Sequence, residues 1–380
     1  MIYLDNAATT PVAPEVIEAM MEELKHYGNP SSKYYPEAVS AKKRLDQYRQ
    51  TTADLFNADA SNIIFNGGAT EGNNHIIKGC FYTFPEKKHF ITTNAEHKSV
   101  LETMKFLESQ GAEVTYLPVS NKCTIDPEDL RNAIKEDTNL VSIFFANNEV
   151  GSLNDIETLS TIAHEKGVLF HTDATQAVGK VEIDLKNKYK HVDFLTFSAH
   201  KIHGPKGAGA EYIGNNEYGA RIKLVPLLNG GDQEFKLRSG TQSMHNIAGV
   251  AKACKLLLVS DTSTFEIIKK IEENFVTELA QTFLDKIIFF GDFKHKIPGI
   301  LSFAILGLNN EMFLANYCNQ LSLSTGSACT INEPSFVLKA MGYEQFIHNV
   351  LRISFSPTTT LSDILNFSRL LSEYLELFSF

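Results

Sequence analysis

One lysine in the sequence stands where it could do covalent chemistry. The apolar run Val192–Phe197 leads into Ser198-Ala199-His200-Lys201, and an upstream run, Val168–Thr172, ends in Asp173. Ligands of α/β proteins bind at the carboxyl ends of strands, and a buried carboxylate is costly unless it meets a cation. Pyridoxal phosphate needs a lysine for its aldehyde and a carboxylate for its pyridinium nitrogen. These two strand ends, with Gln176 just beyond the second, therefore predict a pyridoxal phosphate site.

A glycine-rich turn could hold the phosphate of such a cofactor. The chain passes from an apolar run at Ile63 through Asn-Gly-Gly-Ala to Thr70, and a helical pattern follows. A strand, a glycine turn and a helix in this order present backbone N–H groups to an anion. Ser198 and His200 could add side-chain donors. His97 could stack on the cofactor ring or carry protons, because imidazole titrates near neutrality.

Short apolar runs, predicted to be strands, alternate with amphipathic helical patterns such as Ala38–Phe56, Ser99–Leu107 and Ile156–Lys166. Several of these runs are apolar nearly throughout, which suits strands buried on both faces of a sheet. The alternation predicts a three-layer α/β domain with a mainly parallel sheet. The predicted strands are Asn62–Phe65, Phe90–Thr93, Glu113–Leu117, Leu140–Phe145, Val168–Thr172, Val192–Phe197 and Ala210–Ile213.

The pattern changes in the last third of the chain to long helices, Asn246–Val259 and Thr264–Asp285. Strand candidates at Gly299–Ala304 and Leu351–Phe355 follow, with helices at Glu311–Cys318, Pro334–Met341 and Leu361–Phe378. This succession predicts a smaller α+β domain. We expect residues 15–255 to form the large cofactor-binding domain, and residues 1–14 and 256–380 to form the small one.

Composition narrows the class of protein further. Lys and Arg number 35 against 45 Asp and Glu, and the net charge of −10 argues against direct nucleic-acid binding. No apolar run is long enough to span a membrane, and the first residues lack the features of a secretory signal. Five cysteines without a CxxC pair indicate reduced thiols, so we expect a cytoplasmic protein without a structural metal site.

Nine short motifs, in one order from residue 3 to about residue 357, resemble those of the cysteine desulfurases of the NifS/IscS kind. These are pyridoxal phosphate enzymes of fold type I within the class V aminotransferase group. The motifs are Asp5-Asn6-Ala7-Ala8-Thr9-Thr10, Gly28-Asn29-Pro30, Gly68-Ala69-Thr70-Glu71, Glu96-His97, Asn147-Asn148-Glu149-Val150-Gly151, Asp173-Ala174-Thr175-Gln176, Ser198-Ala199-His200-Lys201, Arg238-Ser239-Gly240-Thr241 and Ser327-Ala328-Cys329.

The resemblance implies a role for each matching residue. Lys201 would bind the cofactor aldehyde, Asp173 would pair with the pyridinium nitrogen, and Gln176 would hydrogen-bond the phenolic oxygen. His97 would stack on the ring, and Arg352 would bind the substrate carboxylate by a bidentate pair. Further contacts are implied for Ala69, Thr70, Ser198, Ala199 and His200 around the phosphate, for Thr241 from the second subunit of a homodimer, and for Asn148 between substrate and cofactor.

Cys329 lies in a run of small and polar residues, Ser324–Thr330, which is unlike the surroundings of a core cysteine. The resemblance implies that this thiol takes sulfur from L-cysteine, leaving L-alanine and a persulfide that passes to a protein acceptor. Such a nucleophile has to be a thiolate, and we expect His97 to act as proton carrier. The other cysteines are predicted to be packing residues: Cys80, Cys123, Cys254 and Cys318.

The chain departs from the family pattern in three places. The segment from Cys329 to Glu333-Pro334-Ser335 is shorter than usual, and Asp232 and Lys236 stand where glycine is common. The chain also ends at Phe380 without a longer tail. These departures favour a specialised enzyme with a dedicated sulfur acceptor, which could serve tRNA or DNA sulfur modification, and an iron–sulfur scaffold stays open as the alternative acceptor.

Two alternative functions are compatible with part of the same set of residues. A selenocysteine lyase or a class V aminotransferase would retain Lys201, Asp173 and Gln176, and Cys329 favours the desulfurase over the aminotransferase. A non-catalytic binding protein on the same fold would be expected to lose the lysine, its acid partner or the thiol first, and all three are present.

Overall fold

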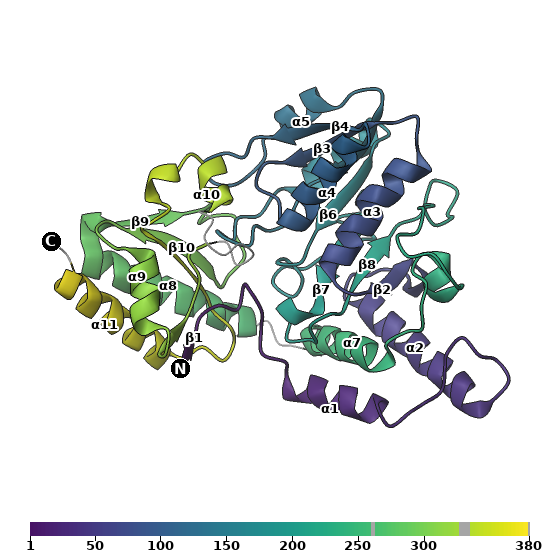
Figure 1. The fold of residues 1–380 in the computed structure, drawn as a ribbon, viewed down its shortest axis with the longest axis horizontal. Helices are drawn as coiled ribbons and strands as arrows, with labels where there is room; N and C mark the ends of the chain where they lie inside the picture. The colour runs from purple at the N-terminus through teal and green to yellow at the C-terminus, as the bar shows by residue number, and fades with distance from the viewer. Residues whose placement is uncertain (260–262, 327–334, 379–380) are drawn as a thin grey trace.

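The computed structural model describes residues 1–259, 263–326 and 335–378 (Figure 1). Among these residues, seven strands form the larger sheet, in which β8 is antiparallel to β2 and β7 and all other neighbours are parallel. Four of the strands, β2, β3, β5 and β7, are completely buried, as expected for a sheet covered on both faces. The order across the sheet is β2 (Ile63–Asn66), β8 (Gly209–Ile213), β7 (Phe194–Ser198), β6 (Leu169–Asp173), β5 (Thr138–Ser142), β3 (His89–Thr93) and β4 (Glu113–Leu117).

Helices pack on both faces of this sheet and complete three layers. One apolar cluster joins α3 (Ala69–Thr83) and α4 (Lys98–Ser109) to the first face. A second cluster includes side chains of α2 (Pro36–Asp54), α6 (Ile156–Glu165) and α7 (Met244–Val259). Two further helices pack on these: α1 (Pro14–Glu23) contacts α7, and α5 (Pro127–Ala133) contacts α6.

A smaller antiparallel sheet lies beside the larger one in Figure 1, with the described strand order β12 (Val350–Ser354), β10 (Ile300–Ile305) and β9 (Ile287–Phe290). Its own core includes Phe275 of α8 (Ser263–Phe283), Phe303 of β10 and Phe367 of α11 (Leu361–Phe378). The remaining elements here are α9 (Asn310–Tyr317), α10 (Phe336–Ala340) and β11 (Leu321–Ser322), which pairs in parallel with β1 (Ile2–Tyr3).

The predicted fold class is confirmed: a three-layer α/β unit with a mainly parallel sheet accompanies a smaller α+β unit. All seven predicted strands of the large sheet are present, with small shifts at their ends. The strand β9 was not predicted, because its four apolar residues follow a long helix without a turn signal. The expectation that Cys318 packs in the core is wrong, since the residue caps the end of α9 and is exposed.

Candidate active site

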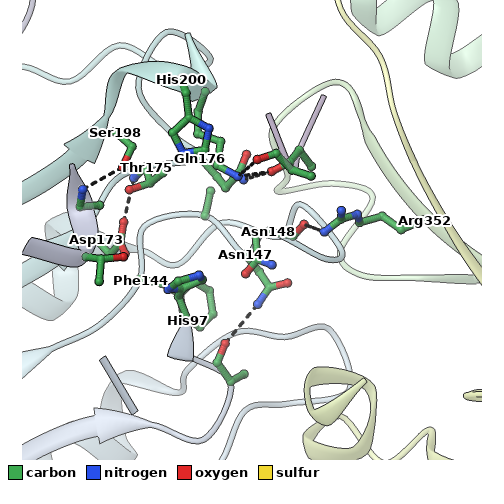
Figure 2. A pocket seen from close by; sticks show the side chains of 17 residues that line it. His97, Phe144, Asn147, Asn148, Asp173, Thr175, Gln176, Ser198, His200 and Arg352 are labelled. Carbon is green, nitrogen blue, oxygen red and sulfur yellow. Dashed lines mark hydrogen bonds between the residues drawn. The ribbon is translucent and has the colours of Figure 1, made fainter. Parts of the chain in front are cut away.

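A cavity of about 330 Å³ opens at the carboxyl ends of the central strands (Figure 2). Asp173 ends β6 and Ser198 ends β7, and these adjacent parallel strands bring both side chains to one edge of the sheet. Arg352 of β12 enters from the opposite side, at the right of Figure 2. The cavity is therefore lined by residues of both sheets.

Most of the predicted site residues line this one cavity: Ala69, Thr70, His97, Asn148, Asp173, Gln176, Ser198, His200, Lys201 and Arg352. Two others do not line it. Ala199 is buried beneath the wall, and Thr241 is exposed outside the cavity. Cys329 lies outside the described residues.

The phosphate-binding candidate is the turn between β2 and α3. Gly68 has a φ of 119°, which favours glycine, and a Cβ there would lie 3.0 Å from Ser198 Oγ. The Ala69 amide at the start of α3 donates to Ser198 Oγ at 2.8 Å. A glycine turn at the amino end of a 15-residue helix, with a hydroxyl beside it, suits an anion.

The Lys201 amine is held against the wall of the cavity by the amino-terminal segment. Its Nζ donates hydrogen bonds to the Ala7 carbonyl and, at 2.7 Å, to the Ala8 carbonyl. These two backbone oxygens were not predicted as part of the site, although they lie in the motif that begins at Asp5. The lysine follows β7 in a single 3-10 turn, Ala199–Lys201, and this turn fixes where its side chain starts.

Asp173 and His97 are joined by a hydrogen-bond network that the sequence did not indicate. Asn73 Nδ2 donates to Asp173 Oδ2 and to Ser99 Oγ, both at 2.8 Å, and Ser99 Oγ lies 2.8 Å from His97 Nδ1. The Ser99 amide also donates to this Nδ1, at 3.1 Å. Nδ1 is therefore an acceptor, and the proton of the neutral ring is on Nε2.

His200 is a neutral donor or acceptor at physiological pH. Burial, followed by the positive charges of Lys201 and Lys206, lowers the pKa of His200 to about 4. Its Nδ1 lies 3.2 Å from Thr9 Oγ1, which orients the ring at the edge of the cavity. A neutral imidazole here can donate a hydrogen bond to an anion without adding a second buried cation beside Lys201.

Arg352 is a buried cation that uses only part of its hydrogen-bond donor capacity within the described residues. The residue is 1% exposed, Nη2 pairs with Asp5 at 2.8 Å, and Nη1 donates to the Asn148 carbonyl at 3.0 Å. Its Nε is buried and has no hydrogen-bond partner among the described residues. A buried guanidinium with unused donor capacity is suited to a ligand carboxylate.

The same cavity offers further groups to a phosphorylated aromatic aldehyde. Thr175 Oγ1 is buried in the cavity wall and has no hydrogen-bond partner in the part of the chain that the structure describes. Asp173, besides the Asn73 bond, accepts from the Thr175 amide at 3.0 Å. A held carboxylate, an amine and an anion cradle together fit pyridoxal phosphate.

Residues 2–367 match the family described as aminotransferase class-V. The chain belongs to this family. A mitochondrial cysteine desulfurase of Arabidopsis thaliana is 39% identical to this class V chain over 368 residues, which are 96% of this chain and 80% of the plant protein. A solved NifS-like protein has a TM-score of 0.90 at 33% identity and 99% coverage of both chains. SspA, solved in complex with cysteine, has a TM-score of 0.82 at 33% identity, covering 95% of this chain and 100% of its own.

The resemblance expected from the nine motifs is thus confirmed, and enzymes of this class V group depend on pyridoxal phosphate. In this class V chain, no helix among the described residues has the length and apolar character to cross a membrane. Residues that sequence reasoning missed, Asn73 and Ser99 above all, lie behind the predicted ones rather than on the cavity wall.

Proposed function

We propose that this protein is a pyridoxal phosphate-dependent cysteine desulfurase that converts L-cysteine to L-alanine and leaves the sulfur as a persulfide on Cys329. The observation that carries the proposal is the convergence of Lys201, Asp173 and Arg352 on one cavity. An amine, a carboxylate and a guanidinium match the aldehyde, the ring nitrogen and the substrate carboxylate. The relatives' names support the same activity.

Cofactor binding is assigned to ten residues of the chain. Lys201 would take the aldehyde, Asp173 would keep the ring nitrogen protonated, and Gln176 would donate to the phenolic oxygen. His97 would contact the ring. The remaining contacts are those of Ala69, Thr70, Ser198, Ala199 and His200 with the phosphate region and of Asn148 beside the substrate. Pyridoxal phosphate supplies an electron sink that makes the substrate Cα acidic.

The chain's own residues perform the sulfur transfer. Arg352 binds the cysteine carboxylate, and His97, whose ring proton is on Nε2, serves as proton carrier at the substrate carbon. The Cys329 thiolate attacks the substrate sulfur, and the Cβ–S bond breaks with its electron pair left on carbon. Protonation of that carbon gives alanine, and the sulfur stays on Cys329 as a persulfide.

The partners and setting follow from the same assignment. Thr241 is exposed and outside the cavity, so we assign it to the phosphate site of a second subunit in a homodimer. The persulfide passes to a protein acceptor that serves iron–sulfur assembly or tRNA or DNA sulfur modification. Four cysteines of the described residues are free thiols, which fits a reducing, cytoplasmic setting.

The test compares two thiol variants of the purified protein. Cys329→Ala should keep the visible absorbance of the lysine-bound cofactor but form neither alanine nor persulfide from labelled cysteine. Cys318→Ala removes an exposed thiol just after α9 and is the matched control, which should turn over like the wild type. Lys201→Ala should lose the visible band.

Other results would point to the competing functions. Keto acid without alanine would indicate an aminotransferase, and strong preference for selenocysteine would indicate a lyase. A wild-type protein without the visible band would indicate a non-catalytic protein. Alanine formation by Cys329→Ala would overturn the assignment of the thiol.

A further inference from the structure

A second lysine, Lys180, lies behind the predicted cofactor lysine. Its Nζ donates a hydrogen bond at 3.0 Å to Oε1 of Gln176, which lies four residues earlier in the same turn region. Lys180 lines a small cavity of about 80 Å³, and Lys201 and Ala7 line both this cavity and the larger one. The amine therefore contacts the site from the side opposite to the pocket.

The contacts of Gln176 fix which end of its amide faces the pocket wall. Gln176 Nε2 donates to the Ala7 carbonyl at 2.9 Å, and a carbonyl oxygen can only accept. Oε1 must then face Lys180, which donates to it. The same Ala7 oxygen accepts from Lys201 Nζ, so one chain of hydrogen bonds runs from Lys180 through Gln176 and Ala7 to Lys201.

We propose that Lys180 is a positioning residue, which holds Gln176 Oε1 so that Nε2 is presented as a donor to the phenolic oxygen of the cofactor. This inference rests on the proposed function, because it takes Gln176 as the partner of that oxygen. Without Lys180 only the Ala7 carbonyl, which also accepts from Lys201 Nζ, orients the amide, so a half-turn rotation costs less, and the oxygen end then faces an oxygen of the cofactor. Two acceptors cannot share a hydrogen bond unless one is protonated.

The surroundings of Lys180 argue against a purely stabilising role. Burial, together with the neighbouring charge of Lys201, lowers the pKa of Lys180 to about 7. An amine held in such a place lowers the stability of the fold compared with an apolar side chain of similar length. A structural requirement would be met better by methionine, so Lys180→Met should unfold at the same temperature as the wild type or higher.

The experiment measures the dissociation constant of pyridoxal phosphate from the full chain, the wavelength of its visible band and the melting temperature. Lys180→Met should bind the cofactor about five- to tenfold more weakly, with a shifted band. Lys180→Arg, which still donates, should restore most of the affinity. Lys186→Met removes an exposed lysine paired with Asp59 and is the matched control, with unchanged affinity and band.

A double-mutant cycle decides whether Lys180 acts through Gln176. In the Gln176→Ala background, Lys180→Met should cause no further loss of affinity. An equal loss in both backgrounds, or wild-type binding by Lys180→Met, would overturn the inference while leaving the proposed function intact. A wild-type protein that takes up no cofactor at Lys201 would overturn both.

Discussion

The side-chain amide of Asn73 donates a hydrogen bond of 2.8 Å to Asp173 Oδ2. The same nitrogen donates to Ser99 Oγ, and Asn73 Oδ1 accepts from the Thr196 hydroxyl at 2.5 Å. Asn73 is completely buried in α3, so all three contacts are shielded from water. One amide thus sets the position of Asp173 and, through Ser99, that of His97.

Replacement of Asn73 by alanine should lower both stability and activity. Loss of the amide removes the Asn73 bond of Asp173 Oδ2 and leaves Thr196 Oγ1 with only its 3.3 Å contact to His171 Nε2, which costs about 2–3 kcal/mol in the free energy of unfolding. Urea denaturation of the cofactor-free chain measures this loss. We also expect lower kcat, because Asp173 and His97 lose a shared support.

Asn74→Ala is the matched control for Asn73→Ala. Asn74 is the next residue of α3, and its amide donates to the Thr70 carbonyl near the surface. We expect a change within about 0.5 kcal/mol. Equal destabilisation by the two variants would contradict the role given to the Asn73 network.

The sequence predicted those site residues well that lie at or just after the carboxyl ends of strands. Asp173, Ser198 and Lys201 come directly after apolar runs, and parallel pairing of β6 with β7 brings them together. Asn73 and Ser99 escaped prediction because polar residues within helical patterns are usually exposed. Their contacts join segments that lie far apart in the chain. Hydrophobic periodicity indicates local helices and strands, but it does not indicate which distant segments meet.

The strands were predictable for a similar reason. Runs buried on both faces are apolar throughout, and the sequence shows this directly. The strand β9 depends on its pairing with β10, a long-range contact that four apolar residues after a helix do not reveal. Thr241 could be assigned only through the family resemblance, since its proposed site lies on another chain.

Ser335→Ala should destabilise the protein increasingly as pH rises. Burial raises the pKa of Glu149, and the Ser335 hydroxyl, which donates to Glu149 Oε2 at 2.5 Å, opposes that rise. Without the hydroxyl the folded-state pKa of Glu149 rises further. The unfolded chain then ionises at lower pH than the folded one, so stability is lost as pH increases.

Urea unfolding of Ser335→Ala from pH 5 to pH 8 measures this trend, with a loss of about 1–3 kcal/mol at the upper end. Glu149→Gln provides the control, because a neutral amide has no proton to exchange. The added pH dependence of Ser335→Ala should therefore vanish in the Glu149→Gln background. A loss independent of pH would show that Glu149 is not the group responsible.

His171 should make the fold less stable in moderately acidic solution. It is completely buried on β6, its Nδ1 lies 2.8 Å from Ser142 Oγ, and burial lowers its pKa to about 4. The usual pKa of histidine is 6.5, and that of His171 in the fold is about 4. Between these two pH values the unfolded chain binds a proton at this residue that the folded chain excludes. The free energy of unfolding therefore falls as pH decreases through this window.

His171→Asn should remove this contribution, so its stability should fall less than that of the wild type between pH 6.5 and pH 4. The exposed His348 is the control, and His348→Asn should keep the wild-type slope. Urea unfolding at several pH values compares the three proteins. Identical slopes for wild type and His171→Asn would contradict the assignment.

Lys236→Gly should stabilise the protein, although glycine usually destabilises. Glu234, Phe235 and Lys236 have φ values of 45°, 60° and 68°, so three consecutive side chains adopt the left-handed conformation that glycine prefers. The buried Glu234 carboxylate holds this turn by accepting from Arg49 at 2.5 and 2.8 Å and from the Phe65 amide at 2.9 Å. Lys236 is therefore a side chain held in a backbone conformation that glycine adopts without strain.

Relief of this strain should raise the free energy of unfolding by about 0.5–1 kcal/mol, measured in urea. Within the described part of the chain, Lys236 has one ionic contact, with the exposed Asp232 at 3.8 Å, and its loss costs little. Lys223→Gly is the control: this exposed lysine lies outside the left-handed region, and glycine there should destabilise by a similar amount. Destabilisation by Lys236→Gly would mean that the turn is not strained at this residue. The Glu234–Arg49 pair would then stabilise a backbone conformation that the chain already favours.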